Sequence, residues 1–378
     1  MRRFPAVSYL ETRAKQRIPH FSWEYLASGT GADTCVSRNR EALDRVSLMP
    51  EFMKGELAPS IERAIFGKTY QAPFGVAPVG LTGLMWPKAE QYLAGAAARH
   101  GIPYTLSTVA TEAPETIGPI ANGNGWFQLY PPRSPEIRKD LLTRAKAAGF
   151  TALLITVDVP TGSRRERQVR AGVSVPPKIT PLMVYRCAIR PSWTAATLET
   201  GRPRFRGLEK YMNTTDMAKM AEFIGTELGG TLDWKYIEAV RAEWDGPIVL
   251  KGVLSAEEAE RAVGAGVDGI GVSNHGGRQF DGAPAAVSVL PEIVDAVGGR
   301  VPIIFDSGVR TGLDVARAVA LGADFVLCGR AFMFGVTALG GRGGDHVADI
   351  LKLDLVNNMV QIGCDKLEAI QARLPKST

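Results

Sequence analysis

The feature that most constrains the fold is a series of short apolar segments that alternates with segments of helical periodicity. Eight apolar segments are bounded by Gly, Pro or Asp, and helix-like stretches such as 89–101 and 255–266 lie between them. Apolar strands alternating with amphipathic helices predict an α/β fold with a covered parallel sheet, and eight such units predict a closed (β/α)8 TIM barrel. The predicted strand segments are 73–80, 104–108, 126–130, 152–160, 247–253, 269–276, 301–308 and 325–330.

A length of 378 residues suits either two ordinary domains or one barrel with additions. The strand pattern favours a single domain over 1–378. We divide it into a mostly helical N-terminal extension, the barrel and C-terminal helices, at 1–70, 71–335 and 336–378.

Two stretches depart from a minimal barrel. The chain from about 160 to 246 separates the fourth strand from the fifth as a long loop, and its part at 172–212 is basic and aromatic. Loops of this length usually have a function. The glycine-rich stretch "ALGGRGGDH" near residue 340 matches no phosphate-binding pattern, and we expect it to be a flexible connection.

The charge and the cysteines exclude several classes of protein. The segment 178–210 contains seven basic and two acidic residues and so accounts for the whole formal charge of +5. No second basic stripe accompanies it, which argues against nucleic-acid binding. The four cysteines are scattered without a C-x-x-C pair, so no metal site is predicted. The sequence has neither the apolar core of a signal peptide nor a stretch of membrane-spanning length, and we expect a cytoplasmic chain.

Polar residues gather where the predicted strands end. In a barrel of parallel strands all these ends lie on one rim, and active sites are built there. A single Ser or Thr at such a place is more often a helix cap, but this explanation does not cover the whole set. The strand-end residues are Gly80, Ser107, Gln128 with Tyr130, Thr156 with Asp158, Lys251, Ser273 with His275, Asp306, and Gly329 with Arg330.

The last two strand ends predict a phosphate site. "FDSGVRTG" (305–312) and "CGRAF" (328–332) follow the seventh and eighth strands, the usual phosphate position in such barrels. Glycines let backbone N–H groups approach an anion, and Arg310 or Arg330 can pair with its oxygens.

In combination, "WFQLY", "TVDVP", "LKGV", "SNHGGRQ" and "DSGVR" resemble one family, the FMN-dependent 2-hydroxy-acid oxidases and dehydrogenases. The resemblance extends over almost the whole chain, from "EYLASG" to "IGCDKLEAI". It implies FMN as cofactor, oxidation of a small L-2-hydroxy acid to the 2-oxo acid, and a homo-oligomer, expected to be a tetramer.

The resemblance also implies which residues hold the cofactor. The phosphate would lie on Gly308, Arg310, Gly329 and Arg330, and Asp306 would bind the ribityl chain. Lys251 would lie where negative charge develops on the reduced ring, and a fixed cation in a dry site stabilises such charge well. The alternative for Lys251 is a salt bridge at the rim. The remaining cofactor contacts would be Pro78, Val79, Gly80, Ser107, Gln128, Thr156, Ser273 and Ser307.

His275 is the candidate general base, because imidazole titrates near neutral pH and Gly276 and Gly277 open the turn that carries it. Asp158 would orient the imidazole and stabilise its protonated form. Arg278 would bind the substrate carboxylate through its planar guanidinium. The resemblance adds Tyr25 and Arg165 on the carboxylate side and Tyr130 at the substrate hydroxyl. The alternative for a histidine at a strand end is a structural hydrogen bond.

Departures from the family pattern bear on the substrate and the electron acceptor. Val79 replaces a threonine that many members have beside the flavin. Val109 and Gly162 stand where members similar to glycolate oxidase carry larger pocket residues, which favours a substrate of lactate size or larger, including a mandelate-like acid. Gly80, where oxidases often have alanine, favours an acceptor other than oxygen.

Basic residues interleaved with aromatics at 178–210 suit an anionic lipid surface. The resemblance to membrane-associated lactate and mandelate dehydrogenases implies peripheral binding to the cytoplasmic face of the inner membrane and a quinone acceptor. A solvated lid or an oligomer contact is the alternative for this loop. Two other functions stay open: a soluble oxidase that releases hydrogen peroxide, and a phosphate-binding barrel without redox chemistry.

Overall fold

The computed structural model describes residues 3–173, 179–212, 217–229 and 232–375. Eight parallel strands form a closed barrel in the order β10-β3-β4-β5-β6-β7-β8-β9. Seven of them lie within their predicted segments, and β5 overlaps its segment but begins one residue earlier, at Gly125. The predicted (β/α)8 barrel is therefore confirmed. Its strands are β3 (Phe74–Val76), β4 (Tyr104–Ser107), β5 (Gly125–Leu129), β6 (Ala152–Thr156), β7 (Ile248–Val253), β8 (Gly269–Val272), β9 (Ile303–Phe305) and β10 (Phe325–Cys328).

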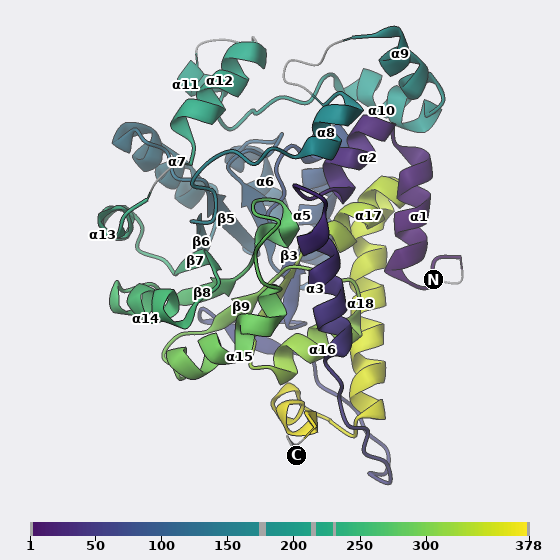
Figure 1. Ribbon diagram of the computed structural model, residues 1–378, viewed down its shortest axis with the longest axis vertical. Helices are drawn as coiled ribbons and strands as arrows, with labels where there is room; N and C mark the ends of the chain where they lie inside the picture. Colours follow the sequence, from purple (N-terminus) through teal and green to yellow (C-terminus); the bar gives the residue numbers. More distant parts are fainter. Residues whose placement is uncertain (1–2, 174–178, 213–216, 230–231, 376–378) are drawn as a thin grey trace.

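Helices cover the outside of the barrel (Figure 1). Capping residues determine where several of these helices begin. The Ser134 side chain caps α7, with Pro135 in the first turn, and Thr311 with Asp314 forms a capping box on α16. Gly101 and Gly298 take left-handed conformations just after α5 and α15. The covering helices are α5 (Ala89–His100), α6 (Pro114–Ala121), α7 (Pro135–Ala147), α13 (Trp234–Glu243), α14 (Ala256–Gly264), α15 (Ala286–Val297), α16 (Gly312–Ala320) and α17 (Arg330–Leu339).

The N-terminal extension closes one end of the barrel and reaches the rim of the other. A hairpin of β1 (Arg63–Ile65) and β2 (Lys68–Tyr70) places Tyr70 against the interior, where its hydroxyl accepts a hydrogen bond from Trp126 (3.0 Å). This hairpin was not expected in an extension predicted to be mostly helical. Three helices, α1 (Val7–Arg17), α2 (His20–Ala27) and α3 (Thr34–Arg45), precede it, and α2 and α3 contribute to the opposite rim.

The stretch between β6 and β7 is helical over much of its length, which corrects the expectation of a long loop. It contains α8 (Glu166–Ala171), α9 (Pro181–Ala188), α10 (Pro191–Thr200), α11 (Glu209–Met212) and α12 (Met217–Glu227), and α9 to α12 lie at the top of Figure 1. The Thr180 side chain caps α9, and Pro181 and Pro191 begin α9 and α10. Within the predicted 172–212 segment, 174–178 lie outside the described residues, and Lys178 is one of them.

The expected flexible connection near residue 340 is wrong. Gly340–Arg342 form a short 3₁₀ helix that leads into α18 (Gly343–Gln361), and Gly343 and Gly344 are buried. A side chain on Gly335 of α17 would lie 2.5 Å from the Gly343 carbonyl oxygen. The glycines therefore allow the backbones of two helices to touch, which is a packing requirement.

Among the described residues, none of the helices combines the length and the apolar character that crossing a membrane requires.

Candidate active site

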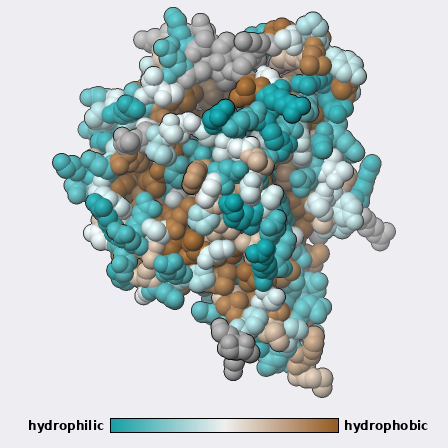
Figure 2. Space-filling model, in the orientation of Figure 1, coloured by the Kyte–Doolittle hydropathy of each residue, from teal (hydrophilic) through white to brown (hydrophobic). Residues whose placement is uncertain are grey.

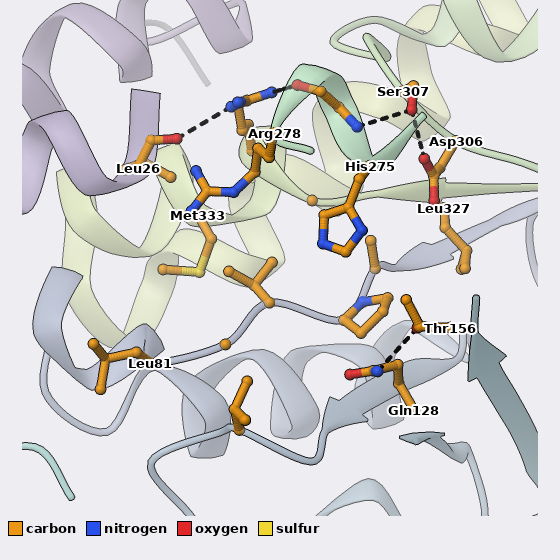
Figure 3. Close-up of a pocket in the computed structure, with 18 of the residues that line it drawn as sticks. Leu26, Leu81, Gln128, Thr156, His275, Arg278, Asp306, Ser307, Leu327 and Met333 are labelled. Carbon is orange, nitrogen blue, oxygen red and sulfur yellow. Dashed lines mark hydrogen bonds between the residues drawn. The ribbon is translucent and has the colours of Figure 1, made fainter. Parts of the chain in front are cut away.

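The carboxyl ends of the strands surround a cavity of about 370 Å³. Figure 3 shows its wall, with the His275 ring projecting between Arg278 and Gln128. Seventeen of the twenty residues predicted for the site line this cavity: Tyr25, Pro78, Val79, Gly80, Gln128, Tyr130, Thr156, Arg165, Lys251, His275, Arg278, Asp306, Ser307, Gly308, Arg310, Gly329 and Arg330.

The other three predicted residues lie behind the wall and contact residues that line it. Asp158 contacts His275, and the Ser107 hydroxyl donates to the side-chain oxygen Oε1 of Gln128 (2.7 Å). The Ser273 hydroxyl accepts a hydrogen bond from Lys251 (2.9 Å) and donates to Asp306 (2.7 Å). These three residues hold lining side chains in place.

His275 lies between an acid and a phenol. Its Nδ1 is 3.0 Å from Asp158 Oδ1, and its Nε2 is 3.1 Å from the Tyr130 hydroxyl. Burial lowers the pKa of His275, and the neighbouring Asp158 charge opposes part of that shift. Burial raises the pKa of Tyr130 to about 12, so its hydroxyl stays neutral at physiological pH. The imidazole is therefore neutral at neutral pH, with Nε2 at the cavity surface.

The turn that carries His275 has an unusual backbone. His275, Gly276 and Gly277 all have left-handed φ values, of 58°, 62° and 75°. For a residue with a side chain this conformation costs about 1–2 kcal/mol. Hydrogen bonds offset that cost: the Ser273 hydroxyl accepts from His275 N (3.0 Å), and the Ser307 hydroxyl accepts from Gly276 N (3.0 Å). The two predicted glycines open the turn without strain, but His275 shares their left-handed conformation, which is strained for a residue with a side chain.

Lys251 lines the cavity and also forms a buried ion pair with Asp306 (3.0 Å). Burial alone would lower the pKa of this lysine, but the charges of Asp306 and Asp158 raise it above its ordinary value. Lys251 therefore stays charged inside the cavity. The two interpretations considered for it, a salt bridge and a cation at the site, apply together.

Four arginines line the cavity, and none of them has an acidic partner among the described residues. Arg165 donates to the side chains of Ser163 and Gln279, and the other three are the buried Arg278, Arg310 and Arg330. Burial lowers the pKa of Arg278 and Arg310 to about 10 and holds that of Arg330 well below its usual value, and nearby arginines add to each shift. Their hydrogen bonds go to backbone carbonyls, including Arg278 to Tyr25 (2.8 Å) and Arg310 to Val309 (2.8 Å). Buried like charges without a counterion fit a ligand that carries anionic groups.

Arg330 differs from the prediction in how its side chain is used. Its guanidinium donates to the carbonyls of Leu26 (3.1 Å), Gly276 (2.8 Å) and Ser28 (2.9 Å). Arg330 is also the first residue of α17, directly after Gly329. Its side chain joins α2 to the His275 turn, so the guanidinium N–H groups are used on these carbonyls. Arg330 can therefore bind an anion through its backbone N–H and contribute its positive charge.

Sequence reasoning missed an apolar part of the wall. Phe205, Ile224 and Leu228 come from the stretch between β6 and β7 and line the cavity together with Val109. No sequence signal identifies them, because the sequence of a long insertion does not show which of its apolar side chains point toward the cavity. Val109 lies at the cavity as expected, whereas Gly162 is not among the residues that line it.

Comparison with known proteins gives consistent results. The model of the family described as FMN-dependent dehydrogenase matches residues 14–376. The L-lactate dehydrogenases of Acinetobacter baumannii and Pseudomonas aeruginosa are each 38% identical over 361 residues, which cover 95% of this chain and 94% of each relative.

Among solved structures, the monotopic membrane protein (S)-mandelate dehydrogenase matches with a TM-score of 0.94 and 30% identity, over 99% of this chain and 100% of the other. A mandelate oxidase matches with a TM-score of 0.84 and 35% identity, over 99% and 98% of the two chains.

The arginine cluster predicts anion-dependent stability. Inorganic phosphate added to protein stripped of its bound ligand should raise the Tm, because an anion that binds only the folded state stabilises it, by about 2.7 kcal/mol at 100 times its Kd. Arg310→Met should reduce this rise. The exposed Arg342 provides the control, and Arg342→Met should keep the full rise. A phosphate effect equal in both variants would place the anion elsewhere.

Proposed function

Since this chain belongs to the FMN-dependent dehydrogenase family and uses FMN to oxidise a 2-hydroxy acid, we propose that the cavity at the carboxyl ends of the strands is where both bind. The observation that carries this proposal is the meeting of three groups in one cavity: the neutral His275, the charged Lys251 and the unpaired arginine cluster. A hydroxy acid that binds beside FMN needs a base, and both molecules need cations for their anionic groups.

The residues present fit FMN. The glycine turn at Gly308 and the charge of Arg310 suit its phosphate, and Asp306 suits the ribityl hydroxyls. Gln128, which donates to Thr156 (2.9 Å), suits the polar edge of the ring. Pro78, Val79 and Gly80 offer backbone at the cavity surface. When bound, FMN supplies the acceptor for the two electrons that leave the substrate carbon.

The substrate side of the site follows from the remaining lining residues. Arg278 and Arg165 supply positive charge for the carboxylate, with Tyr25 beside them. His275 Nε2 takes a proton from the substrate, and Tyr130, 3.1 Å from that nitrogen, is a neutral donor for the hydroxyl group. Asp158 keeps the opposite ring nitrogen oriented and stabilises the imidazolium that forms.

Substitution of the base tests this assignment. His275→Ala should retain the yellow colour of bound FMN, while anaerobic bleaching by lactate, mandelate and longer 2-hydroxy acids is lost. Removal of a general base costs on the order of 10²–10⁴-fold in rate. His20, half exposed on α2, is the control, and His20→Ala should bleach like the wild type. Normal bleaching in His275→Ala would remove this residue from the chemistry.

The pH dependence has a defined sign. A base acts in its neutral form, so the bleaching rate at saturating acid should be level above pH 6.5 and should fall as the pH drops through the pKa of His275, which burial lowers from 6.5. Asp158→Asn removes a charge that raises this pKa, so the acid limb should move to lower pH while the plateau rate falls. An acid limb that stays in place would mean that another group is the base.

We propose an apolar substrate side chain of lactate size or larger, including an aromatic ring. Phe205, Val109, Ile224 and Leu228 form an apolar wall that would bind a side chain of this kind. Phe205 is held by its neighbours: Leu208 is fully buried, and the Gly207 carbonyl accepts a hydrogen bond from Arg144 (2.6 Å). A fixed aromatic side chain is a suitable contact for a phenyl group.

Phe205→Ala should therefore act on large substrates. We expect kcat/KM for mandelate to fall about tenfold, the usual effect of lost apolar contact in a binding pocket. Lactate, whose methyl group offers little apolar surface for such a contact, should keep its kcat/KM. Equal losses for both acids would contradict the proposal that Phe205 contacts the substrate side chain.

We propose a quinone or another non-oxygen acceptor, with peroxide release as the alternative. Gly80 supports this choice, because oxidases of the family often have alanine at this position. The Cβ atom of an alanine there would lie 2.6 Å from Val109 Cγ2, so the substitution would require Val109 to move. Hydrogen peroxide formation measured against dye reduction during turnover separates the two acceptors.

We also propose peripheral binding to an anionic membrane on its cytoplasmic side. The helix α9 has no buried residue, and Leu182, Val184 and Tyr185 are each more than half exposed beside Arg186. Figure 2 shows apolar surface next to polar surface at the upper right, where Figure 1 places α9 and α10. The buried Trp193 of α10 packs against Phe21 of α2 (5.7 Å between ring centroids). This contact attaches the helix that follows α9 to the N-terminal extension.

The membrane proposal predicts a selective loss of lipid binding. The double variant Leu182→Glu with Tyr185→Glu should no longer sediment with vesicles of phosphatidylcholine and phosphatidylglycerol, while dye reduction stays normal. Leu353, 60% exposed on α18, is the matched control, and Leu353→Glu should bind as the wild type does. Unchanged sedimentation of the double variant would favour a lid or an oligomer contact.

Homo-oligomerisation, as a tetramer, is the remaining part of the proposal. The stretch between α3 and β1 exposes Phe52 (66%) and Met53 (100%), which supports contact with another copy. Sedimentation velocity measures the assembly.

A further inference from the structure

Two neighbouring residues of α3 reach the two loops of the site. Asn39 is buried and faces the His275 turn, whereas Arg40 reaches the loop that contains Gly308 and Arg310. Neither residue lines the cavity, and the N-terminal extension that carries them lies far from both loops in the sequence. The contacts of Asn39 are neutral hydrogen bonds, whereas Arg40 makes an ion pair.

Asn39 and Asn274 form a reciprocal amide pair. Asn39 Nδ2 donates to Asn274 Oδ1 (2.8 Å), and Asn274 Nδ2 donates to Asn39 Oδ1 (2.7 Å). Both side chains are more than nine-tenths buried. The remaining bonds of Asn274 hold the turn, since its Oδ1 accepts from Gly277 N (3.2 Å) and its Nδ2 donates to the Pro284 carbonyl (2.9 Å). Rotation of the Asn274 amide would break several buried hydrogen bonds at once.

Asn274 directly precedes His275, so the hydrogen bonds from Asn39 fix the side chain next to the base. Three side chains accept hydrogen bonds from the backbone N–H groups of the left-handed turn. The Ser273 hydroxyl accepts from His275 N, the Ser307 hydroxyl from Gly276 N, and the Asn274 side chain from Gly277 N. A strained conformation persists only where its surroundings determine it. The N-terminal extension contributes to those surroundings through Asn39 and through the backbone N–H of Thr30, which donates to the Gly277 carbonyl (3.1 Å).

Arg40 holds the other loop through charge. Its guanidinium donates to the Gly308 carbonyl (2.7 Å) and to Asp314 Oδ2 (2.6 Å). The fully buried Asp314 also accepts from the backbone N–H groups of Arg310 (2.9 Å) and Thr311 (3.1 Å). Arg40 and Asp314 together therefore fix the backbone around Arg310.

We propose that α3 is a functional part of the site, with Asn39 as a positioning residue for the base His275 and Arg40 as a positioning residue for the loop that binds the FMN phosphate. The proposal rests on the roles given above to His275 and Arg310. It separates two effects within one helix: the neutral pair governs the chemical step, and the ion pair governs cofactor affinity.

The test measures both effects in each variant. Asn39→Asp keeps the size of the side chain but replaces the donor to Asn274 with an acceptor. At saturating acid, anaerobic bleaching should slow about tenfold or more, because misplacement of a reacting group lowers the rate steeply. The Kd for FMN, from quenching of flavin fluorescence by apoprotein, should stay near the wild-type value. Asn39→Ala, which adds no buried charge, should behave in the same way.

Arg40→Gln should do the reverse. The Kd for FMN should rise about tenfold, because a charge-assisted contact to the phosphate loop is lost. Bleaching of the FMN-saturated protein should stay near the wild-type rate, and Arg40→Lys, which keeps the charge beside Asp314, should recover part of the affinity. Ser37→Ala, at an exposed position of the same helix, should change neither observable.

Equal changes of both observables in the Asn39 and Arg40 variants, or loss of folded protein in both Asn39 variants, would reduce α3 to a structural support and overturn the proposal. Failure of the proposed function is distinguishable from this result. If no 2-hydroxy acid bleaches the wild type, the roles of the site are wrong, while the FMN titrations of the Arg40 variants still decide whether α3 positions the phosphate loop.

Discussion

The buried carboxylate of Asp306 joins three strand ends, and the arrangement of the site depends on it. It pairs with Lys251 from the end of β7 and accepts hydrogen bonds from Ser273, after β8, and from Ser307, which follows it in the chain. Since these hydroxyls in turn accept the backbone N–H groups of the His275 turn, one carboxylate connects the buried cation to the base. The interaction also keeps Lys251 charged in a place where burial favours its neutral form.

The site contains more positively charged side chains than acidic partners for them. Lys251 has Asp306, but Arg278, Arg310 and Arg330 have only carbonyl oxygens among their described hydrogen-bond partners. Burial of unpaired charge is unfavourable, and the lowered pKa values of these arginines express that cost. An anionic cofactor and an anionic substrate would remove it, so binding and the stability of the fold are coupled in this enzyme.

The segments added to the barrel divide the remaining tasks. The N-terminal extension closes the bottom of the barrel with Tyr70 and reaches the rim with Tyr25 and α3. The stretch between β6 and β7 presents apolar residues to the cavity on one side and an exposed apolar and basic helix on the other. Substrate choice and membrane contact, as proposed, would thus belong to the same insertion.

The sequence by itself determined the barrel, the rim and most of the residues that line the cavity. Strand and helix periodicity are local, and in a parallel barrel every strand end lies on the same rim, so polar residues such as Gln128, Lys251 and His275 could be placed together without coordinates. Only the tertiary structure decided what depends on contacts between distant segments. The side-chain direction of Phe205, the use of Arg330 on backbone carbonyls and the helix contact at Gly335 and Gly343 are examples. The pairing of Asn39 with Asn274 is another, because its geometry arises when a helix of the extension packs against a turn 235 residues away.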